Sequence, residues 1–164
     1  MTRTIVARQP RSLVLDMRAN GGGNLQTARD FMKSLPNLIP GRIFVLTSPW
    51  TFSAAISSIG YLEQAAPTRV TIVGEEIGDR LEFWAEGRPT TLPRSGVVIS
   101  LATQRHDYAN GCRAYTDCHG PVVQYSIAVP TLGPDILAPW TISVYRSGKD
   151  PGMDAIVAAL RQVQ

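Results

Sequence analysis

The stretch LVLDMRANGGGN, residues 13–24, decides the expected fold. Its apolar half belongs to a short run at residues 12–17, bounded by polar residues and glycines, which is typical of a buried strand. The glycines Gly21–Gly23 then favour a tight turn, and Asn24 can cap a helix whose apolar residues recur at helical spacing. We expect that helix to end at Pro36, because proline lacks the N–H that a helix interior needs.

The same alternation continues along the chain. RIFVLT at residues 42–47 and RVTIVG at residues 69–74 are apolar runs of strand length, and residues 53–65 between them have the pattern of a second helix. Strands joined in this way by helices form right-handed parallel crossovers. The sequence therefore predicts an α/β fold with parallel βαβ crossovers.

The rest of the chain consists of shorter segments. Further strands are expected in three stretches: residues 81–86, 96–102 and 122–129. Several prolines make residues 129–140 an extended, irregular segment. Asp150 as cap and Pro151 at the first helical position predict a C-terminal helix. With about 100 to 200 residues per domain, the 164 residues predict a single domain, 1–164.

Composition excludes several classes of protein. Charged residues make up 18% of the chain, and the 16 basic residues are scattered despite a net charge of +3, so no nucleic-acid partner is expected. No run approaches the ~18 apolar residues of a membrane span. The basic residues are 14 arginines and only two lysines, Lys33 and Lys149, and the two histidines are His106 and His119. A mechanism that needs a lysine or histidine base thus has four candidates.

The sequence does not decide the cellular compartment of the protein. The start MTRTIVARQP has no apolar region behind it, so no secretory signal is expected within these residues. The protein is then either cytoplasmic or an internal piece of a longer chain, and it would be periplasmic or exported if that chain is a longer precursor. The sequence likewise leaves the oligomeric state open.

The two cysteines, Cys112 and Cys118, lie in a polar, Gly-rich segment with five residues between them. This spacing suits a small-loop disulfide. Free thiols and a metal site with His119 or Asp117 are the alternatives, although tetrahedral metal sites usually space their cysteines two to four residues apart.

Two junctions between a loop and a helix concentrate the residues that could carry chemistry. The first is the loop that contains Gly21–Gly23, called the glycine loop here, which lets the backbone approach a ligand closely and suits a phosphate or an oxyanion. A tight turn that only packs the strand against the helix is the alternative explanation for these glycines. In TSPWTFSAAISS, Ser53 lies at a helix start, where the helix dipole stabilises an alkoxide and the amide of Ala54 is free to donate. Serine is also a common helix cap, so a purely structural role is the alternative.

Together the two junctions resemble the S41 serine peptidases, the tail-specific or C-terminal-processing proteases. Their pattern is a strand ending Asp-x-Arg-x-Asn-x-Gly-Gly, followed by a strand that leads to a Ser-Ala nucleophile; the matching residues here are Asp16, Arg18, Asn20, Gly22, Gly23, Ser53 and Ala54. The resemblance implies a ClpP/crotonase-like fold and a catalytic core domain over residues 1–164, as a fragment of a longer chain. It also implies a nucleophile at Ser53 and an oxyanion hole formed by Ala54 and either Gly22 or Gly23.

The sequence differs from the S41 pattern at the position of the general base. Bacterial members carry a lysine roughly 25 residues after the serine, whereas this chain has Asp79 there. An aspartate, with a pKa near 3.9, matches a serine hydroxyl poorly. A second branch, resembling the tricorn protease, uses a histidine from an earlier part of the chain and a carboxylate downstream. No histidine precedes the glycine loop here, so Asp107 is the candidate for the carboxylate and His106 itself for the base, with an ordinary loop histidine as the alternative for His106. The base is then either His106 or a residue outside this chain.

The sequence therefore predicts a serine peptidase or hydrolase that cleaves peptide or ester bonds of a peptide or protein substrate, without a cofactor or metal. A catalytically silent peptide-binding module of the same family is the main alternative. A crotonase-like acyl-CoA enzyme shares the oxyanion loop, but no basic cluster for the CoA phosphates is evident.

Overall fold

The computed structural model describes residues 2–162 and contains two compact units. The first unit holds the residues up to Gly78 together with those from Leu132 onward, and the second holds Asp79–Thr131. That residues 1–164 form one catalytic core remains a prediction. The two units differ in architecture and are described separately. Among the described residues, no helix combines the length and apolar character needed to cross a bilayer.

A parallel four-stranded sheet organises the first unit. Its strands, in spatial order, are β1 (Leu13–Asp16), β2 (Ile43–Thr47), β3 (Val70–Gly74) and β8 (Ile136–Leu137). Every residue of β2 and β3 is buried, as a sheet covered on both faces requires. The predicted α/β class and its parallel crossovers are confirmed.

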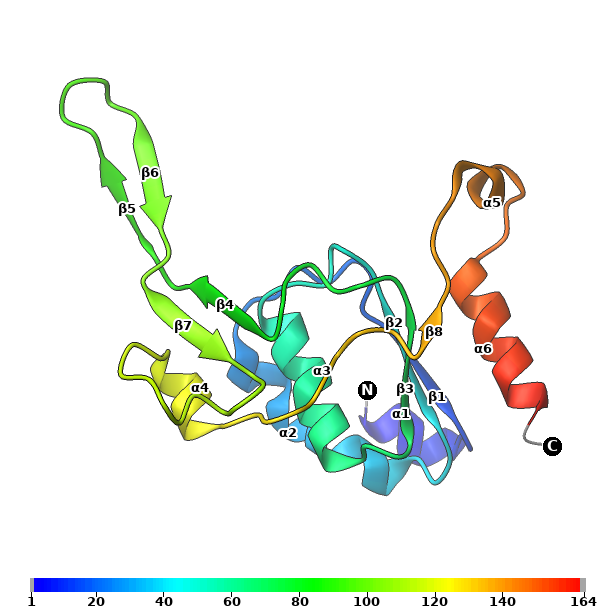
Figure 1. The fold of residues 1–164 in the computed structure, drawn as a ribbon. Coiled ribbons are helices and arrows are strands. Elements are labelled where there is room, and N and C mark those ends of the chain that lie inside the picture. Colours follow the sequence, from blue (N-terminus) through cyan, green and yellow to red (C-terminus); the bar gives the residue numbers. More distant parts are fainter. Residues whose placement is uncertain (1, 163–164) are drawn as a thin grey trace. The chain divides into compact units, whose positions relative to one another are not determined.

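Helices cover both faces of this sheet. Figure 1 shows α2 (Leu25–Leu38) and α3 (Ala54–Ala65) on one side and α6 (Pro151–Arg161) on the other. The core beneath α6 consists of Phe44, Leu46, Val73, Ala138 and Ile156. Two shorter helices, α1 (Thr2–Arg8) and α5 (Ile142–Arg146), complete the unit.

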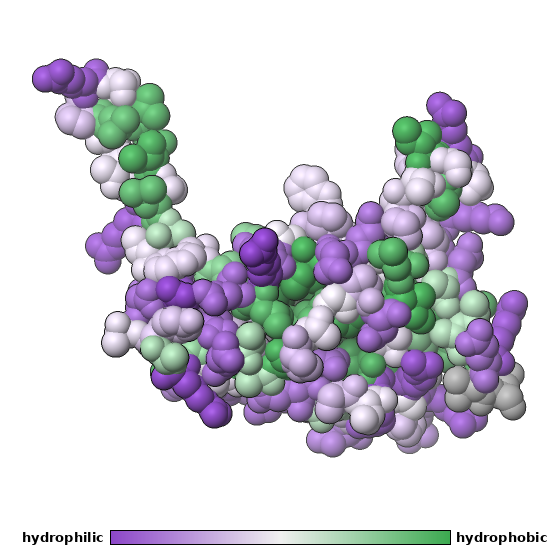
Figure 2. Space-filling model, viewed as in Figure 1, coloured by the Kyte–Doolittle hydropathy of each residue, from purple (hydrophilic) through white to green (hydrophobic). Residues whose placement is uncertain are grey.

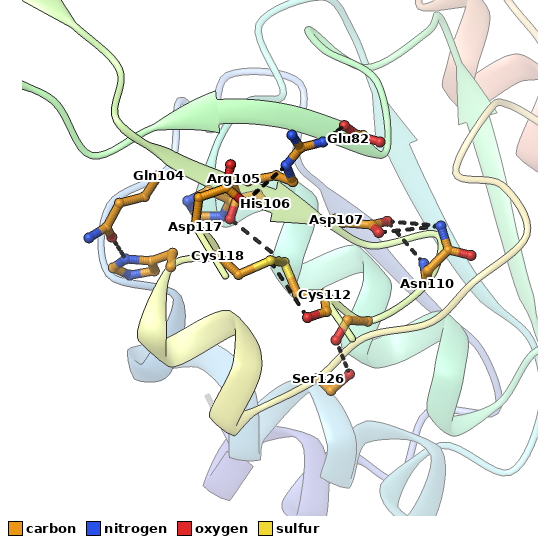
Figure 3. Close-up of a disulfide and its surroundings, with 12 residues drawn as sticks. Glu82, Gln104, Arg105, His106, Asp107, Asn110, Cys112, Asp117, Cys118 and Ser126 are labelled. Carbon is orange, nitrogen blue, oxygen red and sulfur yellow. Dashed lines mark hydrogen bonds and ion pairs between the residues drawn. A yellow bond between two sulfur atoms is a disulfide. The ribbon is translucent and has the colours of Figure 1, made fainter. Parts of the chain in front are cut away.

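The second unit is built from paired antiparallel strands and one short helix. Strand β4 (Glu82–Ala85) pairs with β7 (Gln104–Asp107), β5 (Arg88–Thr91) pairs with β6 (Val98–Leu101), and α4 spans Gly120–Gln124. The β5–β6 hairpin exposes apolar side chains, which Figure 2 shows as a hydrophobic stretch along the hairpin. Cys112 and Cys118 form a disulfide, which decides among the alternatives left open by the sequence (Figure 3).

Two sequence-based predictions about elements are wrong. Residues 122–129 do not form a strand, because Pro121 is accommodated at the start of α4, where its missing N–H leaves no bond unmade. The helix α2 does not end at Pro36 but continues to Leu38, and the amide of Ile39 still donates to the carbonyl of Leu35. Leu35 and Ile39 are fully buried, and their packing offsets the bond that proline cannot make.

Candidate functional site

Ser53 occupies a strained turn between β2 and α3. Its backbone has φ 55° and ψ −124°, a conformation that residues with a Cβ rarely adopt, and its side chain makes no capping hydrogen bond. The preceding turn is fixed by Thr51, whose hydroxyl donates to the carbonyl of Met17 over 2.9 Å and accepts from the amide of Ser48 over 3.0 Å. Strain of this kind persists only where the surroundings impose it, and it is concentrated at functional sites.

The glycine loop packs directly against this serine. A Cβ added at Gly22 would lie 2.7 Å from Ser53 Cβ and 2.9 Å from both Ala54 N and Phe52 O. Gly22 has φ +104°, which also favours glycine. Asn20 joins the two segments, because its carbonyl accepts from the amide of Phe52 over 3.1 Å and its side-chain oxygen accepts from the amide of Gly22 over 3.0 Å. The two junctions noted in the sequence are thus brought into contact.

Two backbone amides at this contact are available to a ligand. In residues 2–162, the N–H groups of Ala54 and Gly23 have no hydrogen-bond acceptor. Ala54 is the first residue of α3, so its amide belongs to the positive end of the helix. Gly23 has φ +135°, and space around it is open. The amide of Gly22 is already bonded to Asn20, so of the two glycines named as alternatives Gly23 has the free donor.

Three hollows flank the glycine loop and the Ser53 turn. One of about 240 Å³ lies between the loop and the first turn of α3, and is lined by Asn20, Gly22, Ala54 and Ser58 among others. A second hollow, of about 630 Å³, is lined by residues between Asp16, at the end of β1, and Gly22. A third, of about 500 Å³, has Trp50 and Trp140 in its wall. The loop therefore has room on both sides for an extended ligand.

Arg18 anchors the glycine loop to the C-terminal helix. Its guanidinium binds Asp16 (Nη2 to Oδ2, 2.6 Å) and Asp150 (Nη1 to Oδ2, 2.9 Å, and to Oδ1, 3.0 Å). Asp150 also caps α6 by accepting from the amide of Met153. The hydrogen bond from Arg18 lowers the pKa of Asp16. Nothing in the sequence could have paired Arg18 with Asp150, because 132 residues separate them.

Replacing Arg18 by lysine is expected to lower the free energy of unfolding by about 1 kcal/mol, because an ammonium cannot bridge two carboxylates as the planar fork does. The control is Arg29→Lys, since Arg29 pairs with Asp30, which is 82% exposed, and such pairs contribute little. Urea unfolding of both variants measures the difference. Since the pKa of Asp16 is lowered in the fold, the Arg18 contribution should be present above the ordinary pKa of aspartate and weaken as the pH falls below it. Equal losses in the two variants would contradict the anchoring role.

His106 and Asp107, the predicted base and carboxylate, both lie on β7 in the second unit, whereas Ser53 belongs to the first. His106 is 3% exposed, and its Nδ1 lies 3.0 Å from the hydroxyl of Tyr108. Burial, together with the neighbouring His119, lowers the pKa of His106 to about 4, so the ring is neutral at pH 7.

Asp107 is fully buried, and its hydrogen bonds stabilise the turn that follows β7. Its Oδ1 accepts from the amides of Ala109 and Asn110, each over 3.0 Å. Figure 3 shows the Asp107 carboxylate beside Asn110. Adjacent residues of a strand point to opposite faces, which is why the His106 and Asp107 side chains have different neighbours. Asp79, at the position of the family's lysine, accepts from the amide of Arg80.

Comparisons with known proteins support the fold. No protein-family model and no curated protein matches the sequence. Among solved structures, the chain is similar to a Bacteroides fragilis protein assigned as an S41 protease, with a TM-score of 0.52 and 16% identity over 92% of this chain and 45% of that one. Lower similarity exists to the photosystem II D1 C-terminal processing protease (TM-score 0.46, 18% identity, 79% of this chain, 35% of that one) and to a lipoprotein from Streptococcus agalactiae (0.41, 14%, 90% and 60%).

The first of these similarities is one of fold, and it relates the mixed α/β architecture with its parallel sheet to an S41 protease structure. The chain spans less than half the length of that protein.

Proposed function

We propose that this chain is the nucleophile-bearing part of an S41-like serine peptidase or hydrolase with a ClpP/crotonase-type fold. The observation that carries the proposal is the strained backbone of Ser53 at the start of α3, held against Gly22. A sharp turn that presents a serine hydroxyl at a helix N-terminus is the arrangement that nucleophilic acyl transfer requires. The similarity of fold to an S41 protease structure supports the same assignment.

In this proposal, Ser53 Oγ attacks the carbonyl carbon of a peptide or ester. The negative charge that develops on the carbonyl oxygen is stabilised by the amides of Ala54 and Gly23, whose donors have no other acceptor in the described chain. Gly22 contributes by its lack of a side chain, which allows the loop to approach Ser53. The hollows along the loop and beside Trp50 provide space for the peptide on either side of the cleaved bond.

The base that takes the Ser53 proton is proposed to be His106, with Asp107 as the carboxylate, or else a residue from outside this chain. His106 is neutral at pH 7 and its Nε2 has no hydrogen-bond partner, so it is able to accept a proton. Its pKa of about 4, however, makes it as weak a base as an ordinary aspartate, which counts toward a base from outside this chain. The two lysines lie elsewhere, Lys33 within α2 and Lys149 just before α6. Neither fits the position of the family's lysine.

A silent peptide-binding module is a second candidate, and one observation favours it. The position of the family's lysine holds Asp79, and the Asp107 carboxylate is engaged by the turn that follows it rather than by His106. Such a protein would keep the loop and the hollows beside it while lacking an efficient base.

Labelling with a fluorophosphonate probe tests the proposal, because the probe reacts with activated serines and leaves a stable adduct. We expect the intact protein to be labelled, and peptide mass spectrometry to place the adduct on Ser53. Ser57 and Ser58, in the same tryptic region, serve as internal comparators. If His106 is the base, His106→Gln should slow labelling by about 10²-fold or more.

Two results would contradict the assignment. An adduct on another serine would remove Ser53 as nucleophile. Absence of labelling in the intact protein, with retained binding of peptides, would favour the silent module.

A further inference from the structure

Three side chains that could ligate a metal converge in the second unit. Glu86 follows β4, His106 lies on β7, and His119 directly precedes α4. Each offers one ligand atom, and these atoms all lie within 4.8 Å of one another. The two imidazole rings are stacked, with centroids 5.1 Å apart. Positions 86, 106 and 119 are widely spaced, so no motif links them in the sequence, which suggested a metal site only as an alternative at the cysteines, with His119 or Asp117.

The chain segment that carries His119 is held in place by several bonds. The amide of His119 donates to the carbonyl of Arg105 over 2.9 Å, which joins it to β7 next to His106. The neighbouring Cys118 is tied to Cys112 by the disulfide (Figure 3). With both cysteines bonded to each other, neither thiol is available as a ligand. The candidate ligands are therefore nitrogen and oxygen atoms alone.

Each histidine is oriented by a hydrogen bond to one ring nitrogen. His106 Nδ1 lies 3.0 Å from the hydroxyl of Tyr108, and His119 Nδ1 lies 2.5 Å from Oε1 of Gln104. Such partners fix the ring orientation of histidines that bind metals, and they leave the other nitrogen, Nε2, for the ion. This pattern is repeated in both histidines.

The Nε2 atom of His106 is the observation that most clearly points to a missing partner. It belongs to a side chain that is only 4% exposed, and it has no hydrogen-bond partner. Its nearest polar contact, Glu86 Oε1, lies 3.6 Å away, which is beyond hydrogen-bond distance. Buried polar atoms are otherwise almost always bonded, so this one calls for an explanation.

We propose that Glu86, His106 and His119 form a binding site for a divalent transition-metal ion of the zinc class. Two imidazoles and one carboxylate suit such an ion, which binds nitrogen and oxygen at about 2.0 to 2.2 Å. Ligand atoms around a tetrahedral ion at these bond lengths lie roughly 3.3 Å apart. Glu86 Oε1 and His106 Nε2 are already 3.6 Å apart, and the other separations, which involve His119, must close by at most about 1.5 Å. The half-buried His119 ring, which is stacked on that of His106, must tilt to direct its nitrogen at the same ion. Three protein ligands leave a fourth position for water.

The site does not depend on the proposed activity of Ser53, but the two proposals share His106. A metal ion on Nε2 of His106 would occupy the atom that a general base needs. If both proposals hold, zinc slows labelling of Ser53. If His106 binds metal but is not the base, zinc binds and Ser53 labelling is unchanged.

Calorimetric titration of the full chain with Zn²⁺ tests the site. The protein should carry no histidine tag, keep its disulfide and be stripped of metal beforehand. We expect one ion per chain, and at least about tenfold weaker binding in Glu86→Gln and His119→Gln. The matched control is Glu76→Gln, an exposed carboxylate outside the cluster, which should bind like the parent. Co²⁺ in place of Zn²⁺ should give visible absorption bands of a tetrahedral or five-coordinate ion.

Glu86→Gln is the decisive variant, because its half-exposed side chain can be changed without disturbing the core, whereas the buried His106 is less suited to substitution. Absence of stoichiometric binding by the parent in the micromolar range would overturn the proposal. Equal affinity of the parent, Glu86→Gln and His119→Gln would also overturn it, because the ion would then bind elsewhere.

Discussion

Ser53→Gly is expected to abolish fluorophosphonate labelling and at the same time to raise the free energy of unfolding by about 1 kcal/mol. The loss of reactivity follows from removal of the hydroxyl. The gain in stability follows from the backbone, because φ 55° and ψ −124° are strained for serine but accessible to glycine. Relief of about 1 to 3 kcal/mol of strain exceeds the roughly 0.5 to 1 kcal/mol that the greater freedom of glycine costs in the unfolded chain.

The comparison with Ser53→Ala isolates the strain. Alanine also removes the hydroxyl, so labelling is lost, but it keeps a Cβ and therefore the strained conformation. Ser53 is the N-cap of α3, and at N-caps glycine is already preferred over alanine by about 1 kcal/mol, so only a clearly larger advantage of Ser53→Gly over Ser53→Ala, about 2 kcal/mol or more, would be diagnostic of strain. Thermal and urea unfolding of the two variants provide the measurement.

A further control separates the turn from the helix. Ser57→Ala, in the interior of α3, should leave labelling of Ser53 unchanged. If Ser53→Gly proves less stable than Ser53→Ala, the strained turn is not a feature of the protein, and the main support for a nucleophile at this position is lost.

The sequence was most informative where local patterns determine structure. Apolar runs bounded by turn residues located β1, β2 and β3, and capping by Asn24 and Asp150 located the starts of α2 and α6. It placed Ser53 at the start of a helix for the same reason. These features depend on neighbours in the chain, and a single sequence contains them.

Features that depend on distant residues could not be derived in this way. Strand β7, with the sequence QRHD, has no apolar alternation, and only its pairing with β4 makes it a strand. The contact of Gly22 with Ser53 and the bond of Arg18 to Asp150 join parts of the chain that lie far apart in sequence. The cluster of Glu86 with the two histidines arises from the same kind of long-range packing.

Gly22→Ala is expected to lower labelling of Ser53 by about 10²-fold or more and to destabilise the protein by about 3 kcal/mol. The added Cβ would lie 2.7 to 2.9 Å from Ser53 Cβ and from the backbone atoms Ala54 N and Phe52 O, and backbone atoms cannot rotate away. Either the loop or the Ser53 turn must therefore shift. The positive φ of Gly22 adds strain to this clash.

The neighbouring glycines provide matched controls, because the same substitution meets different surroundings at each. Gly21 has no atom within 4 Å of an added Cβ and no positive φ, so Gly21→Ala should leave labelling and stability within about 0.5 kcal/mol of the parent. Gly23 has the same open space but φ +135°, so Gly23→Ala should show backbone strain without a clash. It should also disturb the orientation of the free amide.

The expected order of damage is thus Gly22→Ala, then Gly23→Ala, then Gly21→Ala, for stability and for labelling. If the loop is only a packing turn without a catalytic role, we expect the same order for stability. In that case, however, the parent protein itself should not be labelled. A chemical role for the loop predicts that Gly23→Ala loses more labelling than its loss of stability explains, because the Gly23 amide is the proposed donor to the oxyanion. Measuring both quantities on the three variants separates packing from chemistry, and equal labelling of Gly21→Ala and Gly23→Ala would remove Gly23 from the oxyanion hole.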